Sequence, residues 1–173
     1  MMLDKKKTSR FALRTVLVSL PGAQLLDKAP VFLFTARQIE EVLPEVKVMP
    51  LPFAPDWLTG LCAWRKQVLP VIDMAALYGI TCYVSRYFYM AVRVISSESA
   101  ENAAGAQQEK QLLRCILKVS DRISAGEASA DSLPVSAEQL GMNPALIKGI
   151  FTHENRLLIL PDLRPALCAT AAA

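Results

Sequence analysis

The sequence predicts a mainly β fold in which two small antiparallel β subdomains share one hydrophobic core. Three observations lead to this prediction. Short segments rich in β-branched and aromatic residues, bounded by turn residues, recur along the chain. One pair of such segments is repeated, at the same spacing, near the C-terminus. Apolar residues make up 53% of the 173 residues and charged residues 20%, a balance typical of one globular domain with a sizeable core.

The N-terminal half begins with two expected strands, "TVLVSL" and "PVFLF", which are bounded by Pro-Gly and Ala-Pro. The next segment, "TARQIEEVLPEV", lacks strand-like alternation. Its Ile39, Val42 and Leu43 follow the i, i+3, i+4 spacing of a helix before a proline, so we expect a short helical or irregular segment there.

The C-terminal half contains two more strand-like segments, "RYFYMAVRVI" and "QLLRCILKVS". The polar stretch between them lacks periodicity, and we expect a mobile hairpin loop at about residues 96–110. The segment "PVSAEQLGMNPALIKG" is expected to be a connection with at most a helical turn, and residues 169–173, "ATAAA", a frayed tail.

The repeat begins at "PDWLTG" and at "PALIKG", which share a proline, an aliphatic residue and a glycine at the same spacing. From each glycine, 13 residues lead through an apolar strand, a polar turn and a second apolar strand to an aspartate. These pairs are Gly60 with Asp73, and Gly149 with Asp162. The repeat predicts two hairpins of the same construction.

The two aspartates are expected to be structural. Asp is a favoured helix N-cap, and a short helix-like stretch follows both Asp73 and Asp162, the first ending at a plausible C′ glycine, Gly79. Roles as general bases or metal ligands have less support, because no second carboxylate lies nearby in the sequence. His153 is the only histidine and is expected in a hairpin turn. We therefore expect no catalytic site, no metal and no cofactor.

Charge and cysteine content limit the partners and the compartment. The net charge is +3, and the basic residues are scattered apart from Lys5-Lys6-Lys7, so nucleic acid is not an expected partner. The four cysteines have apolar neighbours and form no CxxC pair, so we expect buried, unbridged thiols in a reducing cytoplasm.

The N-terminus imitates an export signal, but Arg14 interrupts its apolar stretch, and we expect a cytoplasmic protein. No run approaches the roughly 18 apolar residues of a spanning helix, so no direct membrane insertion is expected.

The segment "IEEVLPEVKVMPLPFAPDWLTGLCAWRKQVLPVIDMAALYGI" resembles the most recognisable part of CheW-like domains, the coupling modules of bacterial chemotaxis. "RCILKVSDRI" is similar to that family's buried strand, and "GIFTHENRLLILPDLRPAL" to its closing strand pair and helix. The likeness covers about residues 31–167, apart from the polar loop. The positions that fit the family pattern in order are Glu41-Val42, Leu51-Pro52, Ala54-Pro55, Trp57, Gly60, Arg65, Pro70, Val71, Ile72 and Asp73.

The resemblance implies two five-stranded, SH3-like β-barrel subdomains around a shared hydrophobic core, with short helices. They would form a single domain over residues 11–168, between a basic flexible tail at 1–10 and the tail at 169–173. The implied function is a non-catalytic adaptor or scaffold of chemotaxis signal transduction. Its implied partners are the regulatory domain of a CheA-type histidine kinase and the cytoplasmic tip of a methyl-accepting chemoreceptor.

Two alternatives stay open. A divergent CheW-like auxiliary scaffold in a motility or other two-component pathway would keep the fold without bridging kinase and receptor. A small hydrolase or ligand-binding enzyme on a similar β core has less support, because the sequence supplies no matched nucleophile and base.

The resemblance also suggests a partner-binding set: Arg65, Glu41, Lys66 and Trp64. In the family, the arginine matching Arg65 pairs with the acid matching Glu41 and shapes the receptor-facing surface, a task suited to a planar fork of donors. A solvated arginine at a hairpin tip, and Glu40 as the matching acid, are the alternatives.

Two features of the predicted turn bear on this set. Lys66 stands where the family has glycine, and Ala63 where it has asparagine, so the shape of the turn decides where Arg65 points. Trp64, beside the turn, either anchors a partner or packs in the core, and core packing is favoured for Trp57.

Overall fold

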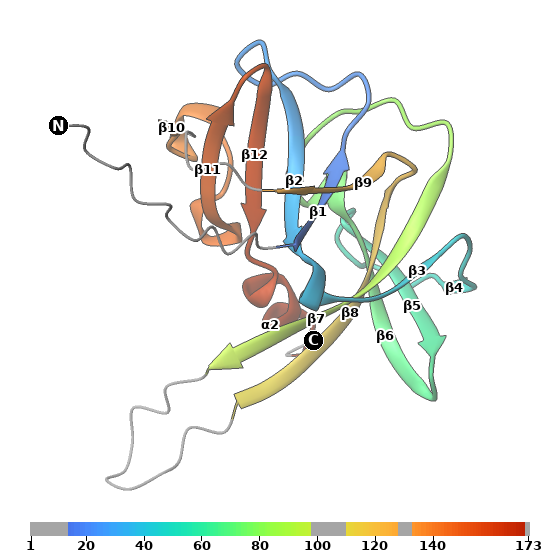
Figure 1. The fold of residues 1–173 in the computed structure, drawn as a ribbon. Coiled ribbons are helices and arrows are strands. Elements are labelled where there is room, and N and C mark those ends of the chain that lie inside the picture. Colours follow the sequence, from blue (N-terminus) through green and yellow to red (C-terminus); the bar gives the residue numbers. More distant parts are fainter. Residues whose placement is uncertain (1–13, 98–109, 128–132, 172–173) are drawn as a thin grey trace, which may run out of the picture.

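The computed structural model describes residues 14–97, 110–127 and 133–171. The fold is mainly β, with two sheets and a few short helices, which confirms the predicted fold class (Figure 1). The predicted tail at 1–10, most of the loop at 96–110 and the last two residues of the chain lie outside the described residues.

Each sheet has five strands of at least five residues and a sixth strand of two residues. The first sheet occupies the upper part of Figure 1, and the second extends below it, from one end of β7 and β8 at the lower left to β3, β4, β5 and β6 at the lower right. The strands of the first sheet, in spatial order, are β10 (Leu133–Pro134), β11 (Ile147–His153), β12 (Arg156–Pro161), β2 (Ala29–Thr35), β1 (Arg14–Ser19) and β9 (Ile123–Glu127). Those of the second are β3 (Ile39–Leu43), β7 (Tyr87–Ser97), β8 (Lys110–Ser120), β6 (Gln67–Asp73), β5 (Leu58–Trp64) and β4 (Val48–Met49).

The two hairpins predicted from the repeat are β5–β6 and β11–β12, and they match in detail. Each joins its sheet by parallel pairing, of β6 with β8 and of β12 with β2. Each has a register shift just before its glycine, Gly60 or Gly149. The backbone N–H of Asp73 donates to the Trp57 carbonyl at 2.8 Å, and that of Asp162 to the Leu146 carbonyl at 2.7 Å. The repeat in the sequence is therefore a repeat in the fold.

Gly60 shows why the repeat needs a glycine in its first copy. Its φ is 150°, and a Cβ there would lie 2.2 Å from the carbonyl oxygen of Met49 on the neighbouring edge strand β4. Any side chain at this position would push β4 away from the sheet.

The main core lies between the two sheets, as the prediction of a shared core requires. Both sheets contribute fully buried side chains to it, including Val18, Phe32, Phe34, Met90, Leu117, Leu157 and Ile159. A smaller cluster belongs to the second sheet alone and consists of Cys62, Trp64, Leu69, Val71, Ala91 and Ile116.

Three expectations need correction. A short helical or irregular segment was expected at "TARQIEEVLPEV"; the 3₁₀ turn η1 (Ala36–Gln38) is helical, but residues 39–43, which carry the helix-like spacing, form β3. The C-terminal helix α2 (Arg164–Ala171) continues three residues into the predicted tail. Cys168 is exposed and Cys82 is partly buried, whereas Cys62 and Cys115 are buried as expected. All four thiols are free.

The connection between β10 and β11 was predicted to contain at most a helical turn, and its helical segments are the single 3₁₀ turns η2 (Glu138–Leu140) and η3 (Pro144–Leu146).

Candidate functional site

The β5–β6 hairpin closes with a two-residue turn at Arg65 and Lys66. Trp64 pairs with Gln67 across its end, and both turn residues have positive φ, 45° at Arg65 and 64° at Lys66. This is the backbone of a type I′ turn, whose twist matches that of the flanking strands. Lys66 adopts the left-handed conformation that the family's glycine favours, so the turn keeps its short form without the glycine.

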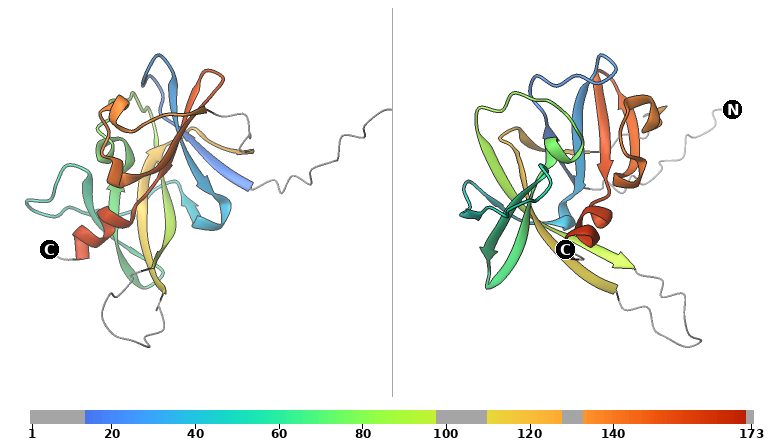
Figure 2. Two further views of the ribbon diagram at one scale, coloured as in Figure 1. Left: turned by 90° about the vertical axis from the view of Figure 1, so that its left-hand side faces the viewer. Right: turned by 180° about the vertical axis from the view of Figure 1, so that it is seen from behind.

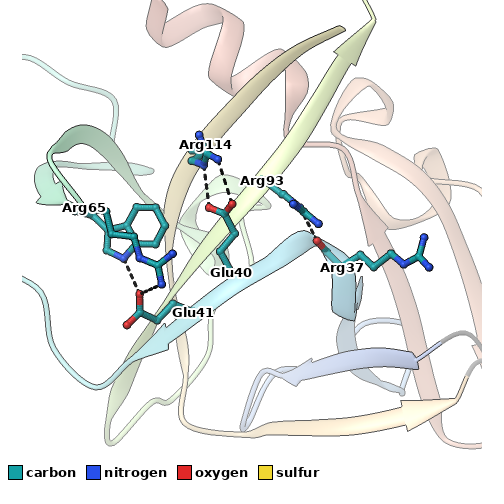
Figure 3. Close-up of polar contacts among 7 residues, drawn as sticks. Arg37, Glu40, Glu41, Arg65, Arg93 and Arg114 are labelled. Atoms are coloured by element: carbon teal, nitrogen blue, oxygen red, sulfur yellow. Dashed lines mark hydrogen bonds and ion pairs between the residues drawn. The ribbon is translucent and has the colours of Figure 1, made fainter.

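The carboxylate of Glu41, on strand β3 of the same sheet, contacts residues at the turn (Figure 3). Its Oε2 accepts a hydrogen bond from Trp64 Nε1 at 3.1 Å and from Arg65 Nη2 at 3.0 Å. The guanidinium carbon of Arg65 also lies 4.5 Å from the centroid of the Trp64 ring. Two contacts of Arg65, with Glu41 and with Trp64, therefore fix its direction, and the Trp64–Glu41 hydrogen bond holds the carboxylate in place.

Burial separates the roles of these residues. Trp64 is only 9% exposed and packs in the smaller core, whereas the side chains of Arg65 and Glu41 are 61% and 38% exposed. Lys66 is exposed at the turn. The buried indole of Trp64 therefore fixes Glu41 through its N–H group. The accessible surface of the site is formed by Arg65, Lys66 and Glu41.

Glu40 pairs elsewhere. Its carboxylate accepts two hydrogen bonds from Arg114 on β8, with Nε to Oε2 at 2.9 Å and Nη2 to Oε1 at 3.3 Å (Figure 3). The side chains are 27% exposed for Arg114 and 14% for Glu40, so this pair is better buried than the Glu41 pair. The acid that meets Arg65 is Glu41. Sequence reasoning missed Arg114, because its strand also carries Lys110 and Lys118 and its acidic partner lies 74 positions away in the sequence.

The comparison with protein families shows to which family the chain belongs. A family model described as the CheW-like domain matches residues 16–122, more than half of the chain. The chain belongs to the CheW-like domain family. In a sequence comparison with curated proteins, none matches.

Solved structures extend the likeness of this CheW-like domain beyond residue 122. The crystal structure of the scaffolding protein TtCheW from Thermoanaerobacter tengcongensis has a TM-score of 0.60 and 17% sequence identity. The similarity covers 92% of this chain and 91% of that one, so the two proteins share the fold over most of their length.

The two repeated aspartates of the CheW-like domain lie at helix starts. Asp73 is the N-cap of α1 (Met74–Leu77): its Oδ1 accepts the N–H of Ala76 at 3.2 Å, and its Oδ2 accepts from Lys118 Nζ at 2.9 Å. Gly79 follows α1 with a φ of 63°. Asp162 accepts the N–H of Arg164, the first residue of α2, at 3.1 Å. Hydrogen bonding from the Arg164 side chain holds the pKa of Asp162 below its ordinary value, although burial opposes this effect.

The structure also locates the other two residues singled out in the sequence, His153 and Trp57. His153 is the last residue of β11 and pairs with Arg156 across the second hairpin turn. Trp57 is partly buried and packs against the main core. In the part of the chain that the structure describes, no three His, Cys, Asp or Glu side chains are grouped as a metal site would require. None of the described helices is long and apolar enough to cross a membrane.

Proposed function

We propose that this CheW-like domain is a non-catalytic adaptor of chemotaxis signal transduction that couples a CheA-type histidine kinase to chemoreceptors in the cytoplasm. The observation that carries the proposal is the fixed position of Arg65. The family's arginine–acid pair is present as Arg65 with Glu41 at 3.0 Å, on a hairpin turn that keeps its short form. Family membership and the scaffold function of the similar TtCheW structure support the same role.

The geometry of the pair suits recognition by a partner. Arg65 and Trp64 both bond to Oε2 of Glu41, and none of the hydrogen bonds among the described residues uses Oε1 of Glu41 or Nε and Nη1 of Arg65. A planar guanidinium with unused donors is suited to carboxylate or carbonyl groups of a partner. Lys66 adds a second positive charge at the tip.

Binding measurements test the proposal. Calorimetry with the regulatory domain of a CheA-type kinase and with a receptor cytoplasmic fragment, both from the organism that encodes this chain, should give binding to each and a ternary complex in gel filtration. Binding to the kinase domain without binding to the receptor fragment favours the auxiliary scaffold that does not bridge the two. Binding to neither partner would contradict the adaptor function.

A charge swap separates recognition from architecture. Arg65→Glu should weaken receptor binding at least tenfold. The double variant Glu41→Arg with Arg65→Glu restores the ion pair with opposite direction, and receptor binding should remain weak if Arg65 contacts the partner. Recovery of binding in the double variant would mean that only the internal pair matters. Arg156→Glu, on the matching hairpin of the first sheet, is the control of equal charge change.

A further inference from the structure

A second polar surface lies where the two sheets meet. A groove of about 490 Å³ is formed by the end of β2 and η1, by β7 and β8, and by β11. Its positive residues are Arg37, Arg93 and Lys148, and its apolar residues include Ile95 and Leu112. It is separate from the Arg65 turn, since the end of β7 and the tip of the β5–β6 hairpin diverge in Figure 1 and in the right view of Figure 2.

The groove has an excess of positive charge. None of the described residues that line it is acidic, and none of the ion pairs among the described residues includes Arg37, Arg93 or Lys148. Lys148 interacts electrostatically with Asp162, but only weakly. The pKa of Asp162 is lowered first by Arg164, and Lys148 makes a smaller contribution. Three cations in one groove repel each other and concentrate anions there.

A hydrogen bond to the backbone fixes the position of the Arg93 guanidinium in the groove. Its Nε donates to the backbone carbonyl of Arg37 at 2.7 Å, and Figure 3 shows the Arg37 side chain directed away from that contact. The two terminal nitrogens of Arg93 and the whole guanidinium of Arg37 have no hydrogen-bond partner among the described residues. Both arginines therefore keep donors for a carboxylate.

The backbone beside the groove is an unpaired sheet edge. β3 pairs with β7 only from Tyr89 to Val92, and β7 then continues to Ser97 with β8 on one side alone. Ile95 and Leu112 lie directly opposite each other on β7 and β8 and are 61% and 42% exposed. An extended peptide can pair as an added strand with an open sheet edge of this kind, and neighbouring apolar side chains favour its docking.

We propose that this groove binds an acidic segment of a partner protein in extended conformation, as an added strand along β7 from Arg93 to Ile95. Carboxylates of the segment pair with Arg37, Arg93 and Lys148, and an apolar side chain contacts Ile95 and Leu112. A strand of four residues spans roughly 13 Å, so a short segment suffices. This site goes beyond the adaptor function and does not depend on it.

Fluorescence anisotropy tests the proposal with a labelled hexapeptide of alternating glutamate and valine. The peptide should bind the wild-type chain at low salt, and a peptide with lysine in place of glutamate should not. Arg37→Glu and Lys148→Glu should each weaken binding at least tenfold. Neither side chain makes a hydrogen bond among the described residues, so we expect both variants to fold. Lys47→Glu, near the opposite sheet edge at β4, is the matched control and should bind as wild type.

Amide hydrogen exchange distinguishes strand addition from simple charge attraction, because the peptide should protect amides between Arg93 and Ile95. Absence of binding, equal binding to Arg37→Glu, or binding without that protection would overturn the proposal. So would tighter binding to phosphatidylserine vesicles or to an oligonucleotide at the same residues, or a dimer in sedimentation that Arg37→Glu dissociates.

Discussion

Arg65 and Lys66 are consecutive residues that both adopt left-handed backbone conformations, with φ of 45° and 64°. Neither is glycine, asparagine or aspartate, the residues that type I′ turns favour. The contacts of Arg65 with Glu41 and Trp64 offset the energetic cost of the left-handed conformation at Arg65. Lys66 has no such compensation among the contacts that the structure gives.

Replacement of Lys66 should therefore stabilise the fold. We expect Lys66→Gly to raise the free energy of unfolding by roughly 0.5 kcal/mol, because relief of a left-handed side chain outweighs the entropy that glycine loses on folding. Lys66→Ala keeps the Cβ and removes the charge, so it should show no gain. Urea unfolding of the three chains provides the measurement, and equal effects of the two substitutions would contradict the turn assignment.

The two arginine–glutamate pairs of β3 should differ in their contribution to stability. Arg65→Met should lower the free energy of unfolding by less than about 1 kcal/mol, because the pair with Glu41 is exposed. Arg114→Met should cost about 2 kcal/mol or more, because it leaves the carboxylate of Glu40 poorly solvated and unpaired. Both substitutions keep an unbranched apolar stem. Chemical denaturation measures both losses of unfolding free energy, and that of Arg114→Met should be the larger.

Thiol labelling should follow burial. We expect Cys168, which is exposed, to react first with a maleimide, and Cys82 more slowly. Cys62 and Cys115 are buried, and burial raises the pKa of both thiols, so they should react only as fast as the chain unfolds. Mass spectrometry of timed samples identifies each site, and Cys168→Ser should remove the fast phase. Early labelling of Cys115 in the native protein would contradict its position in the core.

Acid should weaken the start of α2. The pKa of Asp162 is lowered below its ordinary 3.8, mainly by hydrogen bonding from Arg164, so its charged form stabilises the fold above 3.8. That stabilisation is lost as the pH falls through 3.8 toward the lower folded value. Asp162→Asn should cost about 2 kcal/mol at neutral pH.

The difference between wild type and Asp162→Asn, measured by urea unfolding at each pH, should shrink in acid. Asp121→Asn is the control, because the pair of Asp121 with Arg122 is 3.9 Å long and exposed. A difference that stays constant across the acid range would show that Asp162 does not act through its charge.

Local sequence patterns predicted the hairpins well. The alternation of apolar residues, the glycine and the final aspartate of each copy are short-range features, and they reappear as matching strands and as the register shift before Gly60 and Gly149. The pairing of Arg65 with Glu41 came from family resemblance, and the 3.0 Å contact agrees with it.

The failures have physical causes. The pairing of β3 with β7 shifts register between Ile39 and Glu41, which breaks the strand alternation and leaves apolar residues at helix-like spacing. The pair of Glu40 with Arg114 joins residues 74 positions apart, so no local pattern reveals it. The groove at Arg37, Arg93 and Lys148 likewise depends on how the two sheets meet.

The parallel pairing of β2 with β12 has a consequence for biosynthesis. Arg156–Ile159 lie beside Ala29–Phe32, so β2 is synthesised long before its parallel partner β12. The second sheet, built from residues 39–120, is complete in sequence much earlier. During translation the apolar Val31 and Phe32 therefore lack their β12 neighbours until residues 156–159 have been synthesised, and a product truncated before them would present Val31 and Phe32 to chaperones and proteases.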